Sequence, residues 1–250
     1  MEIQKQKISV MPTSRDYFVL KGLYNFKVMS FPQIARMYFA GNAKPTVVNR
    51  LSKLESAGLI SKYKVPRLLT SGSENVISVV YQITRSGIRE LQKWQPDFDF
   101  WPEPLRLQPF SIDHDLLLVD VLETLKKQKP EVQLLLGDHF SRTPNAQGLK
   151  PDGILIMDEQ SKPVALELEL TAKSEKRYRE LILKYRLSKD FDHVLYVTGN
   201  SQIESKIRTI LGVSDVSQRF KFCQASDVLK PDGGQYNFNL QALSFERKVR

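Results

Sequence analysis

Apolar residues recur at helical spacing in four stretches of the first 94 residues, 15–27, 31–39, 45–59 and 85–94. Ser14 and Ser30 stand where a helix N-cap is expected, and Gly58 is a typical residue just after a helix end. Between the third and fourth stretches, 59–65 and 76–84 are rich in β-formers and are separated by a polar loop. The predicted order is therefore three helices, a β-hairpin and a fourth helix.

The second half of the chain predicts alternating helices and strands. Its first helix, 112–127, carries His114 on an apolar face, and a second helix at 174–189 begins after the capping residue Ser174. The other expected elements are strands at 132–140, 152–158, 164–171 and 193–199, a helix near 200–211, and weaker strands around 218–229 and 236–245. This gives an α+β protein with an αβββαβ core in its second half.

Residues 94–110 hold four prolines and several aromatic side chains, and proline fits neither a helix interior nor a central strand. We interpret this stretch as an ordered linker between a domain at 1–93 and a domain at 111–250. No apolar run approaches the length that a membrane helix needs, and no secretory signal is evident. With a single cysteine, Cys223, the chain is expected to be cytoplasmic and reduced.

The net charge of +9 is unevenly distributed. Residues 1–93 have 15 Lys and Arg against 5 Asp and Glu, whereas residues 111–250 have 21 against 20. An excess of positive charge confined to one domain favours a polyanion as its partner. We therefore expect the first domain to bind DNA, double- or single-stranded.

The element order of the first domain predicts a winged helix-turn-helix. The third helix and the hairpin offer polar and basic side chains that could reach phosphates and base edges, namely Lys44, Thr46, Asn49, Arg50, Lys53, Lys62, Lys64 and Arg67. The alternative is the same fold used for protein contacts alone.

The pentapeptide LKPDG occurs at Leu149–Gly153 and again at Leu229–Gly233. Pro-Asp-Gly ordinarily forms a turn, and Asp232 fits that interpretation. Asp152 differs, because a hairpin with a turn near residue 160 sets it opposite Glu167, and Glu167 and Glu169 share one face of their strand. The alternatives are an ordinary turn residue for Asp152 and a solvated edge strand for the two glutamates.

Three carboxylates close together repel one another unless a cation neutralises them. Hard oxygen ligands suit Mg²⁺ or Mn²⁺, and such an ion can activate a nucleophile at a phosphodiester. Basic residues follow in Lys173, Lys176, Arg177 and Lys184. We expect Lys176 to assist the chemistry, with Lys184 as second choice.

Pro151-Asp152 followed by Glu167-x-Glu169, within a helix, three strands, a helix and a strand, resembles the PD-(D/E)XK nuclease fold of restriction endonucleases over 112–199. In that pattern Glu169 stands where the family has a lysine. Joined to a winged helix, the domain resembles the MobC-type conjugative relaxases and the wider replication-relaxation family. The resemblance implies site- and strand-specific nicking at a plasmid transfer origin, with relaxosome or coupling proteins as possible partners.

The same resemblance implies a role for His114, since the family carries a histidine in this helix. The alternative is a hydrogen-bonded core histidine. Three scattered histidines without a His-x-His pair argue against the relaxase class that uses clustered histidines. A tyrosine nucleophile stays open, with Tyr17 as candidate; its alternative is a core aromatic beside Leu20 and Tyr24.

Two functions follow. The first is a metal-dependent DNA endonuclease in which Asp152, Glu167 and Glu169 hold the metal. The second is a non-catalytic DNA-binding replication or mobilisation factor with a degenerate nuclease fold, which the missing E-x-K lysine favours.

Overall fold

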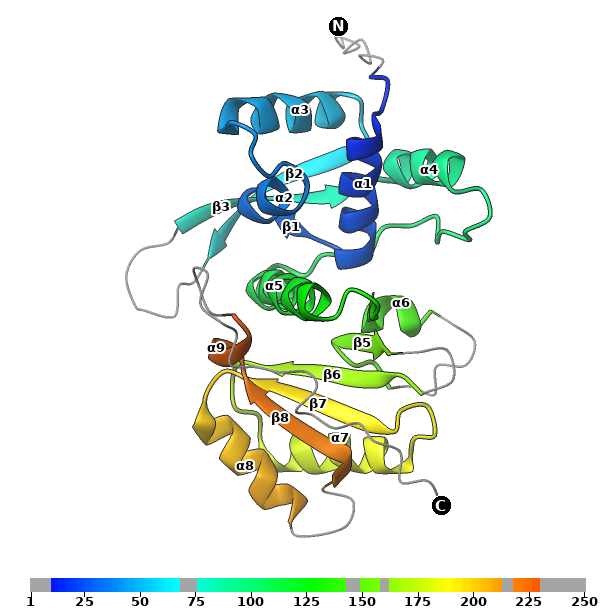
Figure 1. Cartoon of the computed structure of the whole chain (residues 1–250). Helices are drawn as coiled ribbons and strands as arrows, with labels where there is room; N and C mark the ends of the chain where they lie inside the picture. Colours follow the sequence, from blue (N-terminus) through cyan, green and yellow to red (C-terminus); the bar gives the residue numbers. More distant parts are fainter. Residues whose placement is uncertain (1–9, 68–75, 143–148, 158–161, 213–217, 230–250) are drawn as a thin grey trace, which may run out of the picture. The chain divides into compact units, whose positions relative to one another are not determined.

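The computed structural model describes residues 10–67, 76–142, 149–157, 162–212 and 218–229. The chain divides into two compact units, Met1–Leu116 and Leu117–Arg250. Helices and sheets occur in both, which confirms the α+β class (Figure 1). No helix among the described residues is long and apolar enough to span a membrane.

The first unit has the predicted order of three helices, a hairpin and a helix. Its helices are α1 (Ser14–Phe26), α2 (Phe31–Tyr38), α3 (Lys44–Ser56) and α4 (Arg85–Trp94). Strands β2 (Ile60–Arg67) and β3 (Val76–Ile83) pair antiparallel, and the short β1 (Met29–Ser30), which the sequence did not predict, pairs with β3. The 3-10 turn η1 (Pro109–Ser111) leads towards the next helix.

Helix boundaries in this unit follow capping chemistry. The N-cap of α1 is Thr13 rather than Ser14, because Thr13 and Asp16 form a reciprocal capping box. Ser30 caps α2 as predicted and pairs in the same way with Gln33. Gly58 follows α3 with a φ of 72°, a conformation that glycine adopts without strain.

The predicted linker, 94–110, is anchored in the first unit. Phe100 and Leu105 are buried, and the backbone N–H of Trp101 donates to the Tyr24 hydroxyl at 2.9 Å. The buried Gln82 side chain donates to the Leu105 carbonyl. Buried side chains and hydrogen bonds therefore hold this proline-rich stretch within the first unit.

The second unit alternates helices and strands. They are α5 (Ile112–Gln128), which begins in the first unit, β4 (Gln133–Leu136), α6 (Gly137–Phe140), β5 (Gly153–Ile156), β6 (Val164–Glu169), α7 (Glu175–Leu187), β7 (His193–Thr198), α8 (Ser201–Leu211), β8 (Phe220–Gln224) and α9 (Ala225–Val228). The strand expected around 236–245 and residues 230–233 of the second LKPDG copy lie outside the described residues.

The strand predicted at 132–140 is wrong in its second half, because the chain turns into α6 after Leu136. Gly137 explains the turn. Its backbone N–H donates to the Asp152 carbonyl, and a Cβ at this position would lie 1.5 Å from the Pro151 carbonyl oxygen. Only glycine allows this close approach, which fixes the entry to β5.

The sheet of the second unit has the order β4-β5-β6-β7-β8. The first three strands are antiparallel, and β7 and β8 run parallel to β6. Apolar residues of α7 and α8 cover one face, in a core that includes Ala165, Tyr178 and Ile203, while Leu122 of α5 packs near Gly153 on the other (Figure 1). The strand β6 is therefore central, and each of its residues is buried.

The hairpin register is as predicted. Gly153 pairs with Leu166, so the preceding residue Asp152 lies opposite Glu167. The turn itself, at 158–161, lies outside the described residues. The side-chain alternation of β6 then directs Glu167 and Glu169 towards the α7 side.

Candidate active site

Asp152 stands at the entry to β5, where Pro151 and Gly137 fix the backbone. Its Oδ2 accepts a hydrogen bond of 2.8 Å from the backbone N–H of Leu168 in β6. This contact crosses the hairpin between the two glutamates of the central strand. Asp152 is thus held by the hairpin rather than exposed as an isolated turn residue.

Glu167 is 6% exposed and receives a hydrogen bond from the Tyr185 hydroxyl of α7. Burial, reinforced by the nearby Asp152 carboxylate, raises the pKa of Glu167 to about 8. Burial and the neighbouring Glu167 also raise the pKa of Tyr185. A buried carboxyl group beside a second carboxylate is costly, and such groups concentrate at functional sites.

Glu169 ends β6 and is 2% exposed. The Lys173 ammonium lies 2.6 Å from its Oε2, four residues further along the chain. The Lys173 backbone N–H also donates to the Tyr178 hydroxyl of α7. The cation beside the carboxylates is therefore Lys173, while Lys176 and Lys184 are exposed on α7.

Tyr196 of β7 lies directly across from Glu167 in the parallel ladder. Its hydroxyl is buried and has no hydrogen-bond partner among the described residues. Burial, with the two glutamates nearby, raises the pKa of Tyr196 well above its ordinary value. The carboxyl groups are consequently enclosed on this side by phenol side chains from α7 and β7.

We call the residues Asp152, Glu167, Glu169 and Lys173 the acid cluster. The described residues include no group of three or more His, Cys, Asp or Glu side chains placed to hold a metal ion. Within the acid cluster, Glu169 pairs with Lys173, which leaves Asp152 and Glu167 as adjacent carboxyl groups.

Sequence reasoning missed the roles of Lys173 and the tyrosines. The Glu169–Lys173 pair gave no periodic signal, because the two residues are joined by the non-helical segment between β6 and α7. Tyr178 and Tyr185, seven residues apart on α7, share one helix face, which was a usable signal. Tyr196 gave none, because its position depends on the pairing of β7 with β6.

His114 belongs to the first unit, where its Nδ1 lies 3.8 Å from the Asp115 carboxylate, and its role stays a prediction. Asp115 also forms an ion pair of 2.9 Å with Lys27. The three carboxyl groups of the acid cluster belong to the second unit.

Tyr17 is hydrogen-bonded within the first unit. Its hydroxyl donates to the Gln95 side chain at 2.8 Å and accepts from Lys21, and its ring stacks on Trp94. These contacts favour the alternative of a packed aromatic residue over that of a nucleophile.

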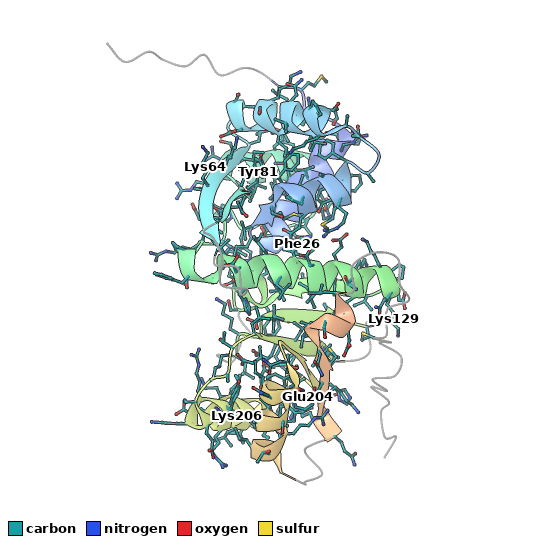
Figure 2. All side chains as sticks on the ribbon, turned by 90° about the vertical axis from the view of Figure 1, so that its left-hand side faces the viewer. Phe26, Lys64, Tyr81, Lys129, Glu204 and Lys206 are labelled. Carbon is teal, nitrogen blue, oxygen red and sulfur yellow. The ribbon has the colours of Figure 1, made fainter. Side chains whose placement is uncertain are left out.

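The predicted DNA-binding residues divide into two groups. Exposed side chains are those of Lys44, Thr46, Asn49 and Lys53 on α3 and of Lys62 and Lys64 on β2. Lys64 is labelled in Figure 2. Arg50 instead forms an ion pair with Asp16, in which Nε donates to Oδ1 at 2.8 Å and Nη2 donates to Oδ2. Asp16 is fully buried, so this pair joins α3 to α1. The side chain of Arg67 lies outside the described residues.

A family model described as replication-relaxation matches residues 20–189. No curated protein and no solved structure matches the chain. The matched range contains the whole acid cluster and Tyr185, and it ends before β7 and α8. Because the match covers more than half of the sequence, the chain belongs to the replication-relaxation family.

Proposed function

We propose that the chain is a DNA endonuclease that nicks one strand at a plasmid transfer origin, as a relaxase does. Family membership points to replication or mobilisation. The observation that carries the proposal is the hairpin register, which brings Asp152 beside Glu167 on a buried central strand, with Lys173 next to Glu169. This arrangement supports a PD-(D/E)XK-type centre in which the lysine has moved from the strand to Lys173.

Mg²⁺ or Mn²⁺ is the proposed cofactor. Asp152 and Glu167 would hold the ion, because Mg²⁺ at phosphoryl sites commonly takes one or two carboxylates and completes its shell with water and substrate phosphates. When bound, the ion would stabilise charge on the phosphodiester and favour an activated water. Two adjacent carboxyl groups fit this donor set without Glu169.

The chain's own residues would orient the site. Tyr185 holds one oxygen of Glu167, and the Leu168 N–H holds one oxygen of Asp152, so both carboxyl groups are fixed before DNA arrives. Lys173 offsets the charge of Glu169 and supplies a cation for the extra negative charge that develops during phosphoryl transfer.

The first unit would supply recognition. Helix α3 followed by the β2–β3 hairpin supports a winged helix, and its exposed lysines match the excess positive charge of residues 1–93. Other relaxosome or coupling proteins are the further partners we propose.

The test is nicking of supercoiled plasmid carrying the DNA that flanks the gene, with Mn²⁺ or with a chelator. We expect Asp152→Asn and Glu167→Gln to abolish nicking while the chain still binds DNA. Asp192→Asn is the matched control, since this exposed carboxylate pairs with Lys162 outside the acid cluster. Equal nicking by wild type and Asp152→Asn would overturn the assignment.

A second candidate function is a non-catalytic DNA-binding replication or mobilisation factor. The observation that favours it is that Glu169 stands at the position of the family lysine in the E-x-K pattern. Calorimetric titration with Mn²⁺ separates the two candidates. DNA binding without measurable Mn²⁺ uptake at millimolar concentration would support the second.

A further inference from the structure

A cavity of 680 Å³ lies between α7 and α8 of the second unit. Its lining residues include Ser201, Gln202, Ser205 and Thr209 from α8, the cations Arg179 and Lys206, the carboxylate of Glu175 and the apolar Ile210. Hydroxyl, amide and cationic groups are the donors that bind phosphate oxygens of nucleic acids. The lining therefore offers several donors that could bind the oxygens of a phosphodiester.

The cavity adjoins the acid cluster through Lys206. The Lys206 ammonium donates to the Lys173 backbone carbonyl at 2.8 Å, and it lies 5.9 Å from the centre of the Tyr178 ring. Lys173 in turn pairs with Glu169. A strand held in the cavity would thus lie next to the residues proposed for chemistry.

Positively and negatively charged side chains lie on different sides of α8. Lys206 and Glu204 point to different sides of the helix (Figure 2), and Glu204 pairs with Arg208 outside the cavity lining. Within the lining, Arg179 forms an ion pair with the Glu175 carboxylate, with Nη2 2.6 Å from Oε1. The positive charge of Lys206 therefore gives the lining a net charge of about +1. The exposed Glu175–Arg179 pair costs little to open, so Arg179 can turn to an incoming phosphate.

We propose that this α7–α8 cavity binds the backbone of the DNA strand that enters the acid cluster. The inference rests on the proposed action on DNA and adds a second contact surface, formed in part by α8, which lies beyond the residues that the family model matches.

Site-directed cross-linking tests the proposal on the full chain. The only cysteine, Cys223, is buried, and burial raises the pKa of its thiol to about 12, so it is a poor competitor for a thiol-reactive probe. Ser205→Cys places a thiol in the cavity lining, and Lys189→Cys places one on an exposed position after α7 as the control. The probe is a short duplex, or its single strand, whose phosphorothioate carries the reactive group.

We expect Ser205→Cys to cross-link several-fold more efficiently than Lys189→Cys, and adding Lys206→Gln to reduce the yield. Equal yields at the two positions would overturn the proposal. Cross-linking does not require cleavage, so the two proposals can fail separately. If the chain cross-links but does not nick DNA, only the proposed nicking activity is refuted. If it nicks DNA but does not cross-link at Ser205→Cys, only DNA binding in the cavity is refuted.

Binding measured by anisotropy over a range of salt concentrations gives an independent readout. For duplex DNA, Arg179→Gln with Lys206→Gln should reduce the log–log salt slope by about 1.8, at about 0.9 per lost phosphate contact. Glu175→Gln should instead tighten binding, because it removes the negative charge from the cavity. An unchanged slope in the double variant, or weaker binding by Glu175→Gln, contradicts a phosphate site.

Discussion

At the residue scale, the pair of Asp16 and Arg50 shows a basic side chain used for packing rather than recognition. Burial alone would raise the pKa of Asp16, but hydrogen bonds from Arg50 and Thr13 outweigh it and hold the pKa below the ordinary value. The Asp16 carboxylate therefore stabilises the fold fully at a pH above its pKa in the unfolded chain. This stabilisation is lost as the pH falls through its lower pKa in the folded chain. Asp16→Asn should lower the free energy of unfolding at neutral pH by about 2 kcal/mol.

Urea unfolding at neutral and acid pH checks this prediction. The difference between wild type and Asp16→Asn should shrink as the pH falls below the ordinary range of a carboxyl group. Glu103→Gln is the control, since Glu103 and Arg85 form an exposed pair, and such pairs contribute at most about 1 kcal/mol. A difference that is independent of pH would contradict the ion-pair explanation.

Lys173 provides the second residue-scale prediction. Lys173→Met removes the ion pair of 2.6 Å with the buried Glu169 carboxylate, which should cost about 3–5 kcal/mol of unfolding free energy. Lys176→Met, on the exposed face of α7, should change it by less than about 0.5 kcal/mol. The double variant Lys173→Met with Glu169→Leu should recover much of the loss. Thermal unfolding of wild type, Lys173→Met, Glu169→Leu and the double variant tests the coupling, and additive losses would refute it.

At the element scale, helix starts and the hairpin register were predictable because both depend on nearby residues. Ser30 and Ser174 cap their helices as expected, and the period of two along β6 set Glu167 opposite Asp152. What escaped prediction depends on contacts between distant segments. The end of β4 follows from Gly137 meeting Pro151, and the role of Arg50 follows from a partner 34 residues away. Neither contact leaves a periodic signal in the sequence.

Gly137 gives the element-scale prediction. An added Cβ would meet the Pro151 carbonyl oxygen at 1.5 Å, which is backbone and cannot move without shifting the start of β5. Gly137→Ala should therefore cost about 3 kcal/mol of stability. Gly153→Ala, where the nearest atom is a Leu122 methyl group at 3.2 Å, should cost less. Chemical unfolding compares the two variants, and the reverse order would show that the strand entry is not constrained at Gly137.

At the scale of the whole molecule, the charge distribution predicts where DNA affinity originates. Residues 1–93 carry a net excess of ten positive charges, whereas residues 111–250 are nearly neutral. The exposed lysines Lys44, Lys53, Lys62 and Lys64 contribute to that excess. With about six phosphate contacts, binding by the full chain should show a log–log salt slope of about −5.

Neutralising these four lysines to glutamine should bring the slope closer to zero by about 3 to 4, since each lost contact removes about 0.9. Lys162→Gln with Lys189→Gln is the control, because these exposed lysines of the second unit line neither the cavity nor the acid cluster. A smaller change from the cavity variants than from the four lysines would mean that most of the affinity comes from the first unit, with the second unit guiding the strand. The control pair could instead change the salt slope as much per removed charge as the lysines of the first unit. DNA binding would then depend on the net charge of the chain, and α3 and β2 would not be a specific DNA-binding surface.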